Sequence, residues 1–194
     1  DIMTYVFTKI SGLPENQIMG SGTILDTARL RYGLSEHFKV AQGNIHAYVF
    51  GEHGDTSFIP WTGAYISGLS TDEYYEEMKA HGKDVKPLDK EAMLEYVQKS
   101  GGKVIAKKGA TFYAVSATVC QLVGLILAAS DSLATVSSML HGEYGIEDVC
   151  LSTLTLVGPN GIQGKVQMRM NKEEVALLKK SADALKEVIA QIEL

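Results

Sequence analysis

Apolar residues recur at helical spacing along much of the chain, and the clearest instance is the C-terminal segment. Asn171 and Glu174 have the three-residue separation of a capping box, which predicts that a helix begins there. An apolar stripe follows on one helical face, consisting of Val175, Leu178, Ala182, Leu185, Ile189 and Ile192. The same reasoning predicts further helices over residues 2–11, 24–38, 89–107 and 113–134. The last of these is apolar nearly all round, so we expect it to be the central buried helix.

β-branched and aromatic residues, bounded by glycine and proline, predict strands between these helices. Two such segments cover residues 45–50 and 58–69, whereas the polar stretch 71–87 is expected to be a mobile connection. Turn residues separate three later segments, which predict an antiparallel meander over residues 135–140, 148–157 and 164–170. The expected fold class is therefore α+β, with long helices packed on antiparallel strands in a single domain over residues 1–194.

The composition disfavours several functional classes. A net charge of -5, from 18 Lys and Arg against 23 Asp and Glu, gives no overall positive field to attract nucleic acid or an anionic membrane. Cys120 and Cys150 lie far apart, which favours reduced thiols and a cytoplasmic protein over a disulfide scaffold. The longest apolar run, residues 119–129, is too short to cross a bilayer. The histidines His37, His81 and His141 do not have the spacing of metal ligands, so no metal is expected.

Three polar residues form a candidate proton relay and anion clamp. Asp26 and Arg29 stand three positions apart on the predicted helix 24–38, so both side chains project from one face. His53 lies in Gly51–Asp55, where flanking glycines let the backbone present the imidazole at the end of a predicted strand. If Asp26 accepts a hydrogen bond from one ring nitrogen, the other nitrogen can exchange a proton with a substrate. Arg29 can bind a carboxylate through two parallel hydrogen bonds.

Each of these residues also has an ordinary structural explanation. An aspartate and an arginine at this spacing more often form a surface ion pair on a helix. A single histidine between glycines is more often a loop residue than a catalytic one. The wider sequence context therefore has to decide between the two interpretations.

That context resembles the active-site segments of the lactate/malate dehydrogenase family. The stretch Gly20–Tyr32, with the sequence GSGTILDTARLRY, is followed at a matching spacing by Gly51–Thr56, with the sequence GEHGDT. Similarity continues through Lys108–Thr111, Tyr144–Ile146, Gly158–Gly161 and the final helix. The resemblance therefore covers essentially the whole chain.

The resemblance implies a role for each residue of the candidate site. His53 would be the acid/base, Asp26 would orient it, and Arg29 would bind the substrate carboxylate. Thr111 matches a substrate-side threonine that is typical of the lactate dehydrogenases in the family. Glu52, directly before the histidine, is also similar to lactate dehydrogenases, because malate dehydrogenases more often have glycine there.

The implied reaction interconverts pyruvate and L-lactate by hydride transfer with NAD. The intact enzyme would be a cytoplasmic homotetramer whose N-terminal Rossmann domain binds NAD. That domain is not expected within this chain, because Gly20–Thr23 lacks the third glycine of the dinucleotide fingerprint and its βαβ setting. The chain also opens inside an apolar periodic segment at Asp1, so we expect a part of a longer protein that is inactive by itself.

Arg31 and His46 form a second candidate site. Arg31 lies two residues beyond Arg29, roughly 200° around the helix axis, and so points away from the same substrate. The alternative explanation is a solvated arginine and an incidental histidine. Bacterial lactate dehydrogenases that fructose bisphosphate activates carry an arginine and a histidine at these places. The resemblance therefore implies an effector site for fructose bisphosphate at Arg31 and His46.

Two other classes of function remain open beside a lactate dehydrogenase. The nearest is a malate or other 2-hydroxy acid dehydrogenase of the same family, which substrate preference would distinguish. A non-catalytic anion-binding or oligomerisation module is the second, but it has no use for a histidine held by a carboxylate.

Overall fold

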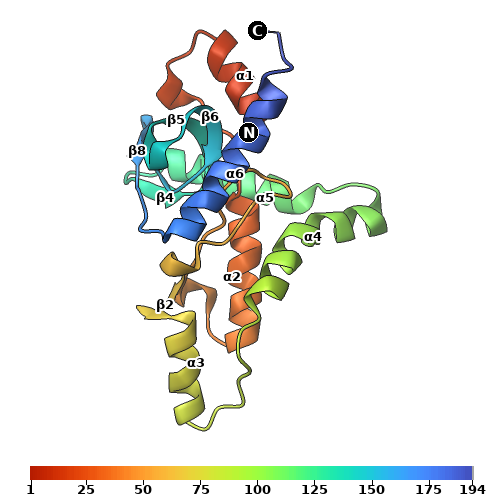
Figure 1. Ribbon diagram of the computed structural model, residues 1–194, viewed down its shortest axis with the longest axis vertical. Helices are drawn as coiled ribbons and strands as arrows, with labels where there is room; N and C mark the ends of the chain where they lie inside the picture. The colour runs from red at the N-terminus through yellow and green to blue at the C-terminus, as the bar shows by residue number, and fades with distance from the viewer. Residues whose placement is uncertain (194) are drawn as a thin grey trace.

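The computed structural model describes residues 1–193 and arranges them around a long central helix (Figure 1). The helices are α1 (Ile2–Ile10), α2 (Ile24–Phe38), α3 (Thr71–Ala80), α4 (Lys90–Lys108), α5 (Tyr113–Ile126) and α6 (Lys172–Ile189). The strands are β1 (Ile45–His46), β2 (Tyr65–Ile66), β3 (Leu69–Ser70), β4 (Ser132–Ala134), β5 (Ser137–His141), β6 (Glu147–Ser152), β7 (Thr155–Gly158) and β8 (Gly161–Lys165). In Figure 1, α2 runs down the middle beside α4, while β4–β8 and α6 lie above and α3 lies at the foot.

Four of the predicted helices are confirmed to within about two residues at each end, namely α1, α2, α4 and α6. The capping box of α6 is formed, because the side chains of Asn171 and Glu174 each accept a hydrogen bond from the other residue's backbone N–H, at 2.9 and 3.0 Å. Along the predicted stripe, Leu178, Ala182 and Leu185 are buried. Ile192 lies beyond the end of the helix.

The prediction of a mobile connection over residues 71–87 is wrong, because its first half is the helix α3. Ser70 and Glu73 form a capping box that starts this helix. The prediction rested on the polar composition of the segment and did not take this capping box into account. The ring of Tyr74 meets the edge of Phe38 at a centroid distance of 5.5 Å, which fixes α3 against α2. A strand over 58–69 is also wrong, because a 3₁₀ turn precedes the short β2–β3 hairpin.

The prediction of a central buried helix over residues 113–134 is wrong in both length and burial. The helix α5 ends at Ile126, and a strand, β4, has formed by Ser132. Only Thr118 and Leu122 are buried along α5, which contacts α2 and β7 on one side. Its other apolar faces have no partner within residues 1–193, so apolar composition overstated burial here.

The strands are all antiparallel, as predicted, but they do not form one meander. The predicted strand 148–157 is two strands, β6 and β7, separated at Thr153–Leu154. β6 pairs with β5 in a two-stranded sheet, whereas β7 lies between β4 and β8 in another. The predicted strand 45–50 is likewise regular only over β1 and then continues through isolated bridges.

Two apolar clusters hold the central helix and the segment that follows it. Leu30 and Leu34 of α2 are fully buried against β1, β2 and α4. Phe50 and Leu178 belong to a second cluster between α6 and the β5–β6 pair. Between the two clusters, the chain from β1 to Phe58 is fixed at both ends, which holds the loop that carries His53. No helix within residues 1–193 is both long and apolar enough to cross a membrane.

Candidate active site

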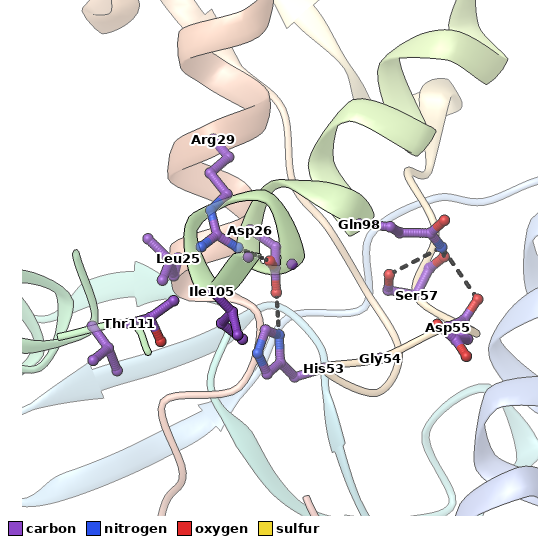
Figure 2. Close-up of a pocket in the computed structure, with 13 residues that line it drawn as sticks. Leu25, Asp26, Arg29, His53, Gly54, Asp55, Ser57, Gln98, Ile105 and Thr111 are labelled. Carbon is purple, nitrogen blue, oxygen red and sulfur yellow. Dashed lines mark hydrogen bonds and ion pairs between the residues drawn. The ribbon is translucent and has the colours of Figure 1, made fainter. Parts of the chain in front are cut away.

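Asp26 lies in the first turn of α2 and bridges two cationic side chains (Figure 2). Its Oδ2 is 2.6 Å from Nδ1 of His53, and its Oδ1 accepts a hydrogen bond from Nη1 of Arg29 at 3.0 Å. The Asp26 side chain is only 6% exposed and that of Arg29 16%, so water screens this pair little. The helix N-terminus also favours a carboxylate at this position.

The loop of His53 is anchored by side chains from distant parts of the chain. The hydroxyl of Ser181, on α6, accepts hydrogen bonds from the Glu52 N–H at 2.8 Å and from the Thr56 hydroxyl at 2.9 Å. Gly51 has a positive φ of +97°, and a Cβ added there would lie 2.8 Å from the same hydroxyl. Only glycine therefore fits this close approach. The His53 side chain remains 58% exposed, so its ring is anchored on one side and open on the other.

The hydrogen bond to Asp26 raises the pKa of His53 above its usual value of 6.5. Partial burial and the neighbouring Arg29 guanidinium oppose that effect on the pKa, while the charge of Asp26 adds to it. The net effect is a raised pKa, which favours the imidazolium over the neutral ring more than in an ordinary histidine. Within residues 1–193, Nε2 of His53 has no hydrogen-bond partner, which leaves it available for proton exchange with a ligand.

A cavity of about 300 Å³ opens beside this relay (Figure 2). It brings together all four of the residues predicted for the catalytic and substrate roles, namely Asp26, Arg29, His53 and Thr111. The face of α4 provides another wall, with Gln98, Gly101, Gly102 and Ile105. An arginine, a proton donor, a hydroxyl and apolar walls suit a small anionic compound with a carbonyl or hydroxyl group.

Comparison with known proteins identifies the family. Residues 23–193 match the lactate/malate dehydrogenase, alpha/beta C-terminal domain. The chain belongs to the lactate/malate dehydrogenase family. It is 45% identical over 194 residues to the L-lactate dehydrogenase of Acetivibrio thermocellus, and 43% identical over 192 residues to L-lactate dehydrogenase 1 of Clostridium acetobutylicum. These matches cover 100% and 99% of this chain but 60% of each relative, so the chain spans about three fifths of their length.

The solved structures agree with this placement in the dehydrogenase family. The L-lactate dehydrogenase from Clostridium thermocellum superposes with a TM-score of 0.90 at 36% identity. The superposition covers 100% of this chain and 62% of that structure. The prediction of a lactate/malate dehydrogenase C-terminal fold is therefore confirmed.

Arg31 and His46 do not line the cavity, and the structure places them on the other side of α2. Nε of Arg31 donates to the Ala47 carbonyl at 3.1 Å, and its guanidinium stacks on the Tyr48 ring at 5.0 Å. His46 is exposed on β1, directly before the carbonyl that Arg31 binds. Arg31 therefore contacts the two residues that follow His46, and the effector role of Arg31 and His46 stays a prediction.

Sequence reasoning did not single out three polar residues of the cavity, namely Asp55, Ser57 and Gln98. Gln98 of α4 donates to the Ser57 and Asp55 carbonyls at 2.9 and 3.2 Å and so fixes the far end of the His53 loop. Periodicity placed Gln98 on a helix but carried no signal for a partner about forty residues away in sequence. Within residues 1–193, no group of three or more His, Cys, Asp or Glu has the arrangement of a metal site.

Proposed function

We propose that this chain is the substrate half of an NAD-dependent L-lactate dehydrogenase that interconverts pyruvate and L-lactate. The observation that carries the proposal is the 2.6 Å contact between Asp26 and His53 beside Arg29, all three on one cavity. A purely structural domain has no use for an exposed histidine whose inner nitrogen is held by a buried carboxylate.

The relay assigns a task to each ring nitrogen of His53. Asp26 accepts from Nδ1–H, fixes the tautomer and stabilises the imidazolium. Nε2–H then donates its proton to the carbonyl oxygen of pyruvate, and it takes the proton back when lactate is oxidised. Because its pKa is raised, a larger fraction of the imidazole carries this proton at a given pH than in an ordinary histidine.

Arg29 would bind the substrate carboxylate and so align the carbonyl with His53. Its guanidinium offers a planar pair of donors to a carboxylate, and its partial burial strengthens that interaction. Thr111, which also lines the cavity, would contact the substrate with its hydroxyl. The similarity to the L-lactate dehydrogenases of Acetivibrio thermocellus and Clostridium acetobutylicum supports lactate over malate as the substrate class.

NAD supplies or accepts the hydride in this reaction, but the described residues do not form its binding site. The sheets within residues 1–193 are antiparallel, whereas dinucleotides bind at the carboxyl ends of parallel strands beside a glycine-rich turn. We therefore propose that the nucleotide binds to residues outside this chain. The chain by itself is expected to be inactive.

The test supplies this chain with the nucleotide-binding half of the Acetivibrio thermocellus relative and follows NADH oxidation. Turnover with pyruvate, lost in His53→Asn while the protein stays folded, is the expected result. A preference for oxaloacetate over pyruvate would move the assignment to malate dehydrogenase. Folded protein that reduces neither acid would refute the proposal.

The same enzyme tests the effector site at Arg31 and His46. Fructose bisphosphate should increase turnover, and Arg31→Gln or His46→Gln should abolish that increase. Activation that survives both changes would return the two residues to ordinary surface roles. The size of the particle, expected to be a tetramer, can be measured in the same samples by light scattering.

A further inference from the structure

The helix α4 carries two adjacent glycines, Gly101 and Gly102, in its interior. Glycine is the poorest helix former apart from proline, so two in succession weaken a helix. Neither glycine has the positive φ that would require this residue type. Their presence in α4 therefore needs another explanation than backbone conformation.

Close packing does not explain these glycines either. A Cβ added at Gly102 would meet no atom within 4 Å, and one added at Gly101 would meet only the two terminal nitrogens of Arg29, both at 3.9 Å. Gly33 provides the contrast, because a Cβ there would lie 2.7 Å from Sδ of Met93, where α2 and α4 pack together. Side chains are thus missing from α4 at two positions that have room for them.

The missing side chains would all lie on the cavity. Gln98, Gly101, Gly102 and Ile105 have the spacing i, i+3, i+4 and i+7, which places them on one face of α4, and all four line the cavity. The middle of that face is therefore bare backbone. This bare stretch of α4 lies next to the guanidinium of Arg29, which we propose to bind the substrate carboxylate.

We infer that the Gly101–Gly102 wall makes room for the side chain of a 2-oxo acid larger than pyruvate. This inference rests on the proposed function and names the substrate class of the same site. Ile105, Leu25 and Val115 line the same cavity, so the side chain that fits is apolar. Among the residues that line it, Arg29 and His53 are the only ones that carry positive charge, which leaves no cation for a second substrate carboxylate.

The experiment compares substrates in the enzyme completed with a nucleotide-binding half. It measures kcat/KM for pyruvate, 2-oxobutanoate, 2-oxopentanoate and 2-oxohexanoate. The unchanged enzyme should reduce the five- and six-carbon acids at no less than about a tenth of the pyruvate value, because each added methylene finds apolar surface. Gly102→Leu should lower the ratio of the six-carbon acid to pyruvate by about tenfold or more, and Gly102→Ala should lower it less.

Gly124→Leu is the matched control. Gly124 also lies inside a helix, α5, and a Cβ there would likewise meet no atom within 4 Å, but it does not line the cavity. This variant should leave the substrate ratio unchanged.

Three results would overturn the inference in different ways. An unchanged enzyme that reduces pyruvate but not the longer acids would exclude the larger substrates. A Gly102→Leu enzyme that keeps its kcat/KM for all four acids would show that the wall does not contact the side chain. Equal losses for all four acids would mean that the glycines serve only the flexibility of α4. An enzyme that reduces no 2-oxo acid at all would instead refute the proposed function, and this inference with it.

Discussion

Lys165, at the end of β8, is a largely buried cation, and its replacement by methionine should stabilise the chain at neutral pH. Nζ of Lys165 donates to the hydroxyls of Ser138 and Thr155, and the second of these contacts is 3.4 Å long. No carboxylate within residues 1–193 lies close enough to form a salt bridge with it. Burial therefore lowers the pKa of Lys165 from 10.5 to about 8.

The size of the effect follows from that change in pKa. At about 1.4 kcal/mol for each pH unit, the difference between 10.5 and about 8 corresponds to about 3 kcal/mol. Below pH 8 the lysine is charged in both the folded and unfolded states, so the folded state carries the whole penalty. Between pH 8 and 10.5 the unfolded state binds more protons, and the penalty disappears as the pH rises. Losing the partner of the buried Ser138 hydroxyl offsets about 1 kcal/mol of the gain in Lys165→Met.

Urea denaturation of both proteins at several pH values measures this effect. The fluorescence of Trp61, the single tryptophan, which packs against the core around α2, reports unfolding. Lys165→Met should be more stable than the unchanged chain by about 2 kcal/mol at pH 7, and this advantage should shrink by about 3 kcal/mol towards pH 10.5. Lys180→Met, at an exposed lysine of α6, is the control and should show no such trend. A stability difference that stays constant between pH 7 and 10 would refute the reasoning.

Four further predictions concern the active site and the loop that carries His53. Asp26→Asn should lower pyruvate turnover by about 10²- to 10⁴-fold and shift the pH profile to lower pH. The shift is expected because the hydrogen bond to the Asp26 carboxylate is the largest cause that raises the pKa of His53. An unshifted profile would contradict this role of Asp26. Reduction in the unchanged enzyme should decline as the pH rises through that raised pKa, and lactate oxidation should show the opposite trend. Arg29→Lys should raise the KM for pyruvate by about tenfold, with a smaller change in kcat, because a point charge replaces the planar pair of donors. Ser181→Ala should destabilise the chain by about 1 kcal/mol, measured by urea denaturation, because it leaves the partly buried Glu52 N–H without this partner.

The sequence predicted the residues of the site better than it predicted their surroundings. Asp26 and Arg29 are related by helical spacing, and this relation survives folding because it is local. The strand predicted before His53 is regular only over β1, and isolated bridges at Phe50 and Gly51 continue it towards the histidine. Ser181 and Gln98 secure the same loop, but they come from helices 129 and 41 residues away from their partners. A single sequence holds no signal for such contacts, since each residue reads as an ordinary position on a helix surface.

The errors in the fold have a related cause. The apolar pattern indicates which residues avoid water, but not which surface covers them. It therefore predicts α5 at the centre of the domain, whereas α5 lies largely exposed among the described residues. In residues 71–87, polar composition concealed a capping box at Ser70 and Glu73 that was visible in the sequence. The aromatic contact between Phe38 and Tyr74 then stabilises a helix whose composition alone did not favour it.

The two oxygens of Asp26 connect substrate binding to proton transfer. Oδ1 accepts from Arg29 and Oδ2 contacts His53, so one buried carboxylate serves both cations. The charge of Arg29 lowers the pKa of His53 and works against Asp26. A substrate carboxylate on Arg29 would neutralise that charge and so raise the pKa further. The proposed substrate therefore increases the protonated fraction of His53 when it binds, and a compound without a carboxylate has no such effect.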